Sequence, residues 1–579
     1  MHKQCEQTQT KLNNKLSKHM STKYFLPAIA AASLFLATSC SSELDPLTSD
    51  NFTCSPSPLV EVGGKVDATI SVTYPEKYFS KKAVLTATPV LVYETGETKS
   101  ASITFQGEKV QGNDQQISYK YGGNATFKAS FDYIDAMASS KLYVELSAES
   151  GGKTYTLPRV WVADGVIATE SVAEAKGATP AHAKDNFVKD TFDKYVATLI
   201  YQYQSTYLRS SETKKEEMKN VEAVIKATKD EERREFTGIE MVSTASPEGA
   251  YTLNEKLASG RENASAKYLN RMLKRVKMEG EITPEQIAED WEGFKSLVQA
   301  SNIQDKQLVL SVLGRISDPE RREAEIKNLA AAYKELAEEI LPQLRYSKVT
   351  ATVKNIGHTD EEILSMLGNP SSLTVEELLY AATLVKTTKE QNEIFNKTLK
   401  TYPNDYRAYN NIGNLLFAEG KLTDAETWFK KANSINAAAA EPNMNLGLLA
   451  MQKGDLTAAE AYLGKAGSCP EYAEAMGTLL TNQGKYAQAI TTFGNTKSNN
   501  AAVANICAGN YSAAKSILEG VAAKNAQTYY LLAVVGARTN NESAVATNLK
   551  KAVSMDKNLA AKAKVDCEFA KYNAVVTVL

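Results

Sequence analysis

Residues 242–272 contain side chains whose types and spacing could bind an anion. The stretch reads as an apolar strand, a corner with Ser246 and Gly249, and an amphipathic helix that Ser246 could cap. Asn254 and Arg261 share one face of that helix. An amide and a fixed cation beside a helix N-terminus can hold a carboxylate, so we predict a carboxylate-binding site. The alternative is that Arg261 is an ordinary solvated arginine.

Asparagines gather in a second stretch, and these could bind a peptide. Each asparagine side chain offers both donors and an acceptor, so a row of them can hydrogen-bond to an extended main chain. The candidate contact residues are Asn410, Asn411, Asn414, Asn443 and Asn445. The alternative is an ordinary polar surface.

Residues suited to metal binding or catalysis are sparse. Of four histidines, His2 and His19 lie in a segment that we expect to be removed, and His182 and His358 are far apart. We therefore expect no metal, no cofactor and no histidine-based active site. The many carboxylates of residues 282–342 alternate with lysines and arginines, which is typical of solvated helix faces. We predict that the chain is not an enzyme.

The bulk properties indicate a globular protein of several domains. A length of 579 residues exceeds what one core supports, so we expect three or four domains. The content of 43% hydrophobic and 23% charged residues is ordinary for such proteins. A formal net charge of −2 provides no basic field, so we expect no nucleic-acid partner.

The signal segment, residues 1–40, indicates export. Lys23 precedes an apolar run too short to span a membrane as a mature helix, and small residues then lead to Cys40. Residues 37–40 resemble the processing box of bacterial lipoproteins. The resemblance implies that Cys40 carries the lipid and anchors the chain in the outer membrane of a Gram-negative bacterium, at the periplasmic face rather than the cell surface. The alternative is a cleaved secretory signal with an incidental cysteine.

Residues 50–165 alternate between apolar and polar side chains, most clearly at 65–72 and 141–146. Such alternation predicts half-buried strands, and the turn sequences between them indicate an all-β sandwich of about seven strands. Residues 166–188, rich in Ala, Thr and Lys, are predicted to be a linker.

Residues 189–356 follow a strand–helix–strand–helix–strand order. This βαβαβ order predicts an α+β domain with helices packed on a small mixed sheet. A helical insert is expected over residues 282–342, beginning at Thr283 and Pro284, before a final strand at 346–354.

The corner and helix of this region resemble the C-terminal OmpA-like domain of Gram-negative envelope proteins. Gly249, Asn254, Leu257 and Arg261 stand at the positions of that family's Gly, Asn, Leu and Arg. The resemblance implies peptidoglycan binding, in which an Asp and the Arg hold diaminopimelate. Ser246 stands at the Asp position, and a hydroxyl cannot supply the charge that pairs with the ligand amine.

Residues 372–570 carry the clearest periodicity of the chain. Gly413 and Gly447 are 34 residues apart, as are Ala425 and Ala459, and small residues there let two helices approach closely. The pattern resembles the tetratricopeptide repeat (TPR). This resemblance implies an all-α solenoid with a concave surface that binds peptides or proteins.

Together these features predict a non-enzymatic cell-envelope lipoprotein that acts as a protein-interaction or assembly scaffold. Its expected partners are an envelope protein or peptide at the TPR surface, and the membrane at the lipid. The alternative is a structural anchor of the outer membrane that binds peptidoglycan through Arg261. An enzyme that acts on glycans would need converging carboxylates with raised pKa values in the acidic insert.

Overall fold

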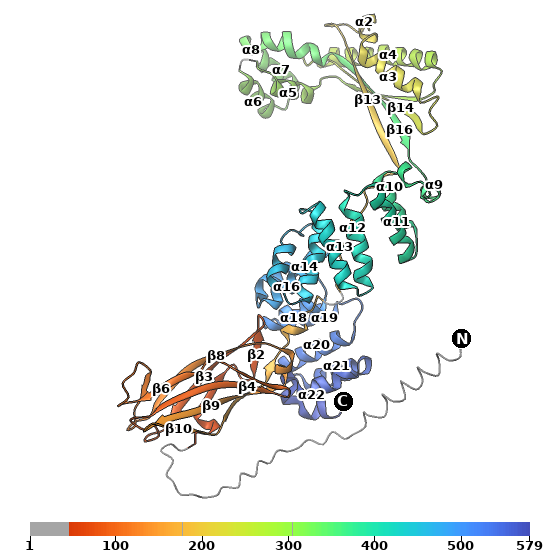
Figure 1. Cartoon of the computed structure of the whole chain (residues 1–579). Helices are drawn as coiled ribbons and strands as arrows, with labels where there is room; N and C mark the ends of the chain where they lie inside the picture. Colours follow the sequence, from red (N-terminus) through yellow and green to blue (C-terminus); the bar gives the residue numbers. More distant parts are fainter. Residues whose placement is uncertain (1–45, 176–177, 304) are drawn as a thin grey trace, which may run out of the picture. The chain divides into compact units, whose positions relative to one another are not determined.

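The computed structural model describes residues 46–175, 178–303 and 305–579 (Figure 1). The described chain divides into two compact units. One contains the residues up to Thr169 together with Gly536–Leu579, and the other is Glu170–Val535. The predicted signal segment, residues 1–40, and Cys40 lie outside the described residues.

Two sheets form the β-rich region of the first unit. One contains β1 (Phe52–Ser55), β2 (Leu59–Val62), β3 (Lys65–Tyr74), β8 (Gly123–Asp132) and β12 (Val166–Ile167). The other contains β4 (Val84–Tyr93), β5 (Gly96–Lys99), β6 (Ile103–Gly107), β7 (Gln115–Ile117), β9 (Ser140–Ser150), β10 (Lys153–Thr156) and β11 (Val160–Asp164).

The two sheets share one apolar core, so the region is a sandwich. Along β3, buried residues alternate with more exposed ones, because successive side chains of a strand point to opposite faces. Val66 and Ile70 of β3 belong to the same core as Leu85 of β4 and Val144 of β9. The described strands outnumber the seven expected, because short strands such as β5, β7 and β10 contain too few residues to show an alternation.

The last helices of the chain belong to the same unit as the sandwich. They are α21 (Glu542–Met555), α22 (Asn558–Val565), η7 (Cys567–Tyr572) and α23 (Asn573–Thr577). The buried carboxylate of Glu568 accepts hydrogen bonds from the Thr169 hydroxyl and from Arg538, at 2.7 and 2.9 Å for the latter. The helical region expected over 372–570 is therefore divided between the two units.

A four-stranded mixed sheet forms the centre of residues 189–356. Its strands, in spatial order, are β13 (Asp190–Ile200), β16 (Tyr346–Ile356), β14 (Arg234–Thr244) and β15 (Glu281–Ile287). The pair β14–β15 is parallel and the other pairs are antiparallel. Helices α3 (Glu216–Ala227) and α4 (Tyr251–Val276) pack on one face, where Val221 and Leu269 share a core with Met241 and Val349.

Two local predictions in this region were wrong. Helix α4 begins at Tyr251 with Ala250 as its N-cap, so Ser246 does not cap it, and its hydroxyl instead donates to Glu248. Residues 283–286 belong to β15 rather than to a helix start, because pairing with β14 gives their main chain partners that a local Thr-Pro pattern cannot reveal.

The helical insert therefore begins after β15 and extends to Leu344. It contains α5 (Trp291–Ala300), α6 (Lys306–Arg315), α7 (Pro319–Asn328), α8 (Ala330–Glu335) and two short turns, η4 (Leu336–Ile340) and η5 (Leu341–Leu344). Its own apolar core includes Phe294, Val309 and Leu336.

After the short helices α9 (Asp360–Met366) and η6 (Pro370–Ser372), the second unit continues with helices that mostly form antiparallel pairs (Figure 1). They are α10 (Val375–Leu384), α11 (Thr388–Thr401), α12 (Tyr406–Ala418), α13 (Leu422–Ile435), α14 (Ala440–Gln452), α15 (Leu456–Leu463), α16 (Tyr472–Asn482), α17 (Tyr486–Phe493), α18 (Asn499–Cys507), α19 (Tyr511–Glu519) and α20 (Ala526–Arg538). A Cβ on Gly413 would lie 2.5 Å from the Phe429 ring, and one on Gly447 would lie 2.7 Å from Leu463. The predicted close approach of paired helices is confirmed.

Candidate functional site

The predicted linker lies along the helical repeats instead of through solvent. We call residues 170–187, described at 170–175 and 178–187, the connecting segment. Its main chain is hydrogen-bonded by side chains of α10, α12, α14, α18 and α20, each of which is the first helix of a pair. It runs opposite to the order of the repeats, since Val172 contacts α20 whereas Asn186 contacts α10.

The centre of the site is a group of asparagines around Ala181. The Ala181 N–H donates to Asn445 Oδ1 at 2.6 Å. The Ala181 carbonyl accepts hydrogen bonds from the Nδ2 atoms of Asn410, Asn414 and Asn445, at 3.0, 3.0 and 2.9 Å. Ala181 is only 1% exposed, so its main-chain groups are shielded from water. The asparagine amides provide the hydrogen bonds that water would otherwise make.

Asn411 binds the second alanine in the same manner. Its Oδ1 accepts the Ala183 N–H at 3.0 Å, and its Nδ2 donates to the Ala183 carbonyl at 2.9 Å. Helix geometry explains the cooperation of the α12 side chains: Asn410 and Asn414 are four residues apart and Asn411 and Asn414 are three apart, so all three can reach the segment. Each amide uses donor and acceptor together, which fixes the register of the segment.

A charged and aromatic contact holds the end of the segment that leads to β13. The Asn186 N–H donates to Glu376 Oε2 at 2.6 Å, and Arg407 binds both oxygens of Glu376, at 2.9 and 2.8 Å. These Arg407 bonds outweigh partial burial and lower the pKa of Glu376, so it remains a carboxylate. The Phe187 ring stacks on Tyr380 with centroids 4.4 Å apart.

Three further amide side chains hold the other end of the segment. Gln452 donates to the Ala175 carbonyl at 3.4 Å, Asn500 to the Glu174 carbonyl at 3.0 Å, and Gln527 to the Val172 carbonyl at 2.9 Å. In addition, the Tyr486 hydroxyl donates to Glu170. The contacts therefore continue along nearly the whole row of first helices.

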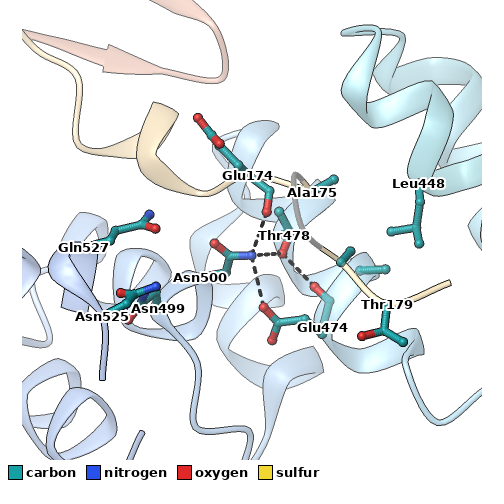
Figure 2. A pocket seen from close by; sticks show the side chains of 12 residues that line it. Glu174, Ala175, Thr179, Leu448, Glu474, Thr478, Asn499, Asn500, Asn525 and Gln527 are labelled. Carbon is teal, nitrogen blue, oxygen red and sulfur yellow. Dashed lines mark hydrogen bonds between the residues drawn. The ribbon is translucent and has the colours of Figure 1, made fainter. Parts of the chain in front are cut away.

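A polar cavity of about 340 Å³ remains between this end of the segment and the repeats (Figure 2). The Asn500 amide bonds there to Glu174, Glu474 and Thr478. One Glu474 oxygen, Oε2, is buried without a hydrogen-bond partner. Burial raises the pKa of Glu474, although hydrogen bonds from Ser498 and Asn500 oppose this shift.

The structure brings together four of the five asparagines that the sequence singled out. Asn443 is the fifth, and its amide instead donates to Ala437 and Ala439, just before its own helix. Sequence reasoning missed Gln452, Asn500 and Gln527. The 34-residue spacing relates Asn411 to Asn445, but the later repeats are shorter and no fixed spacing relates these three residues.

Arg261, the cation of the predicted carboxylate site, is buried inside the α+β region. Arg261 is 1% exposed, and its guanidinium donates to the carbonyls of Ser205, Thr244 and Gln202 at 3.0, 2.7 and 3.4 Å. Burial lowers the pKa of Arg261 to about 10, which still leaves it protonated at neutral pH. A carboxylate could reach this cation only by displacing the loop that covers it.

The remaining donors of that site bind carboxylates of the chain itself. The Gly249 N–H donates to Glu323, and Asn254 Nδ2 donates to Glu289 Oε1 at 3.0 Å. Glu248 accepts hydrogen bonds from Ser246 and from Arg345. The chemistry expected of the site is therefore present, but glutamates of the corner and of the helical insert occupy it.

The described residues contain no group of three or more His, Cys, Asp or Glu side chains that could hold a metal ion. Within the same ranges, no helix is long and apolar enough to cross a membrane. The sequence analysis considered the carboxylates of residues 282–342 as a possible active site. Two of them, Glu289 and Glu323, accept hydrogen bonds from amide and main-chain groups rather than converging on an open pocket.

Family models of the tetratricopeptide repeat match residues 393–443 and 440–466. These ranges contain Asn410, Asn411, Asn414 and Asn445 and the close glycine contacts of α12 and α14. The helical region of this chain therefore carries tetratricopeptide repeats, as predicted. The comparison with curated proteins gives no match.

Several solved structures are similar to parts of the chain. A tetratricopeptide repeat protein from Parabacteroides merdae is 16% identical, with 44% of this chain and 98% of that chain covered and a TM-score of 0.27. Pseudomonas aeruginosa pilF is 15% identical, with 36% and 98% covered and a TM-score of 0.29. PilW, a type IV pilus biogenesis factor, is 18% identical, with 33% and 93% covered and a TM-score of 0.27.

Proposed function

We propose that this chain is a non-enzymatic scaffold of the cell envelope, anchored by lipid at Cys40, and that its repeats bind an extended peptide. The observation that carries the proposal is the binding of Ala181 and Ala183 by asparagines of α12 and α14. These contacts are made to main-chain groups, which every extended peptide offers. The groove thus has the chemistry of a peptide receptor.

Partner capture in the native host tests the scaffold role. Membranes are crosslinked, the tagged chain is purified, and candidate proteins are then tested for direct binding to the purified chain. We expect at least one envelope protein to bind directly and saturably. If no candidate binds directly after efficient crosslinking, the scaffold role is contradicted.

The lipid anchor has a separate test, because it rests on the residues before position 41. Labelled palmitate should be incorporated into the wild type and not into Cys40→Ala, and the variant should leave the membrane fraction. A wild-type chain that remains unlabelled would contradict the anchor while leaving the scaffold role open.

Peptidoglycan binding has less support in the geometry, because Gly249, Asn254 and Arg261 already bind groups of the chain. A muropeptide pull-down with the wild type and a variant in the largely buried Arg345–Glu248 pair would test it. Saturable muropeptide binding by the wild type would favour the anchor over the scaffold.

A further inference from the structure

We propose that the repeats read a defined peptide pattern, small–x–small–x–x–x–aromatic, and that residues 181–187 of this chain fill the site in cis. The three reading positions are Ala181, Ala183 and Phe187. This inference deepens the proposed function, because it names the class of peptide that the groove accepts and the occupant that it already has.

The two small positions follow from burial. Ala181 and Ala183 are each 1% exposed, whereas His182 between them is exposed. The asparagines bind both the N–H and the C=O of each alanine, so the main chain lies directly against α12 and α14. A larger side chain at either alanine would move the main chain away and break these bonds. The His182 ring is exposed and has a side-chain contact with the repeats, to Asn411 Nδ2 at 3.4 Å.

The aromatic position follows from a second anchor at a fixed distance along the peptide. Phe187 stacks on Tyr380 at an interplanar angle of 25°. The preceding N–H, that of Asn186, is bound by Glu376, which Arg407 holds in place. The spacing from Ala183 to Phe187 therefore cannot change without loss of one anchor.

Covalent continuity explains why another peptide would rarely enter. Residues 181–187 are covalently joined to η3 (Glu170–Val172) on one side and to β13 on the other, so their effective concentration at the groove is on the order of millimolar. A free peptide with micromolar intrinsic affinity would then bind the intact chain about 1,000-fold more weakly than an emptied groove. An outside partner must displace residues 181–187.

The test uses the full chain and a fluorescent peptide with the sequence of residues 178–188, measured by anisotropy. The wild type is compared with the double variant Ala181→Arg, Ala183→Arg, whose own segment no longer fits. A third protein adds Asn411→Ala and Asn445→Ala to that double variant. We expect binding by the double variant, at least about 100-fold weaker binding by the wild type, and none by the third protein.

Two altered peptides test the pattern. Leucine in place of both alanines, or alanine in place of phenylalanine, should weaken binding to the double variant at least about tenfold. Equal binding of the leucine peptide, or no binding of the original peptide to a folded double variant, would overturn the proposal. Neither outcome would contradict the scaffold role, since a partner could bind to another surface. Conversely, a failure to find partners in the crosslinking experiment would not contradict the peptide pattern.

If the double variant does not fold, hydrogen exchange of the wild type tests whether residues 181–187 occupy the groove. The amides of Ala181 and Ala183 should exchange far more slowly than that of the exposed Val188, and Asn445→Ala should accelerate exchange at Ala181 first. Unprotected alanine amides in the wild type would contradict occupation of the site.

Discussion

Asn445 binds both main-chain groups of Ala181 and also donates to Asn410 and Asn414. Replacement by alanine leaves the buried Ala181 N–H without its acceptor, which costs about 1–3 kcal/mol. We therefore expect Asn445→Ala to lower the stability of the repeats by about 2 kcal/mol. Denaturant unfolding followed by a signal from the repeats measures this, and the exposed Asn392→Ala on α11 is the matched control, which should change stability by under about 0.5 kcal/mol.

Arg261 offers a residue-scale test of its structural role. Arg261→Ala removes the guanidinium bonds to three carbonyls and a cation that lies 5.4 Å from the Tyr201 ring centre. We expect a loss of about 3 kcal/mol or more in the stability of the α+β region. Arg271→Ala, exposed on the same helix, is the control. Unchanged stability of Arg261→Ala would show that Arg261 is not needed for the fold.

Glu474 gives a pH dependence with a definite sign. Its pKa in the folded chain is raised above the ordinary 4.5 by burial. As pH rises from about 4.5 through the folded pKa, the unfolded chain loses its proton first, so stability falls across this window. Glu474→Gln removes that penalty. Thermal unfolding should show the variant more stable than the wild type at pH 7, with the difference shrinking toward pH 4. A difference independent of pH would contradict the prediction.

The residue types indicated which chemical groups these sites bind, but not which molecule or segment provides those groups. Asn410, Asn411, Asn414 and Asn445 bind an extended main chain, as their donors and acceptors suggested. Nothing local in the sequence indicates that the peptide is the segment more than 200 residues earlier, because such a contact depends on how the whole chain folds.

At the scale of elements, the paired helices depend on glycine at their crossing points. Gly413→Val would force atoms into the Phe429 ring, since even a Cβ would lie 2.5 Å from it. We expect a loss of about 2–3 kcal/mol from overpacking in the first complete repeat. Gly467→Val, where a Cβ would meet nothing within 4 Å, is the control. Circular dichroism melting of both variants decides, and equal melting temperatures would contradict the packing argument.

Long periodic elements were predictable because their patterns are local. The 34-residue spacing located α12 to α15, and alternation located β3, β9 and β16. The strand β15 was not predictable in the same way, because Thr283 and Pro284 favour a helix start locally and only pairing with β14 makes this segment a strand. The composition of the predicted linker, residues 166–188, likewise did not indicate burial, because alanine occurs both at exposed positions and in closely packed grooves.

At the scale of the whole chain, both predicted recognition sites are filled from within. The helical insert supplies Glu289 and Glu323 to the corner before α4, and the connecting segment supplies Ala181 and Ala183 to the repeats. Ligands that are part of the same chain have high effective concentrations, so these contacts stabilise the fold before any partner arrives.

Proteolysis of the intact chain tests this at Lys184. The Lys184 side chain is exposed, but its neighbours Ala183 and Asn186 are hydrogen-bonded to the repeats. A protease must extend several residues around the cleaved bond, so cutting requires local release of the segment. We expect trypsin to leave Lys184 uncut in the wild type and to cut it at least about tenfold faster in Asn411→Ala, Asn445→Ala, because each lost buried hydrogen bond lowers the cost of release by about 1 kcal/mol or more. Asn392→Ala should behave as the wild type. Mass spectrometry of the first fragments identifies the site, and rapid cutting after Lys184 in the wild type would show that the segment is not held in the groove.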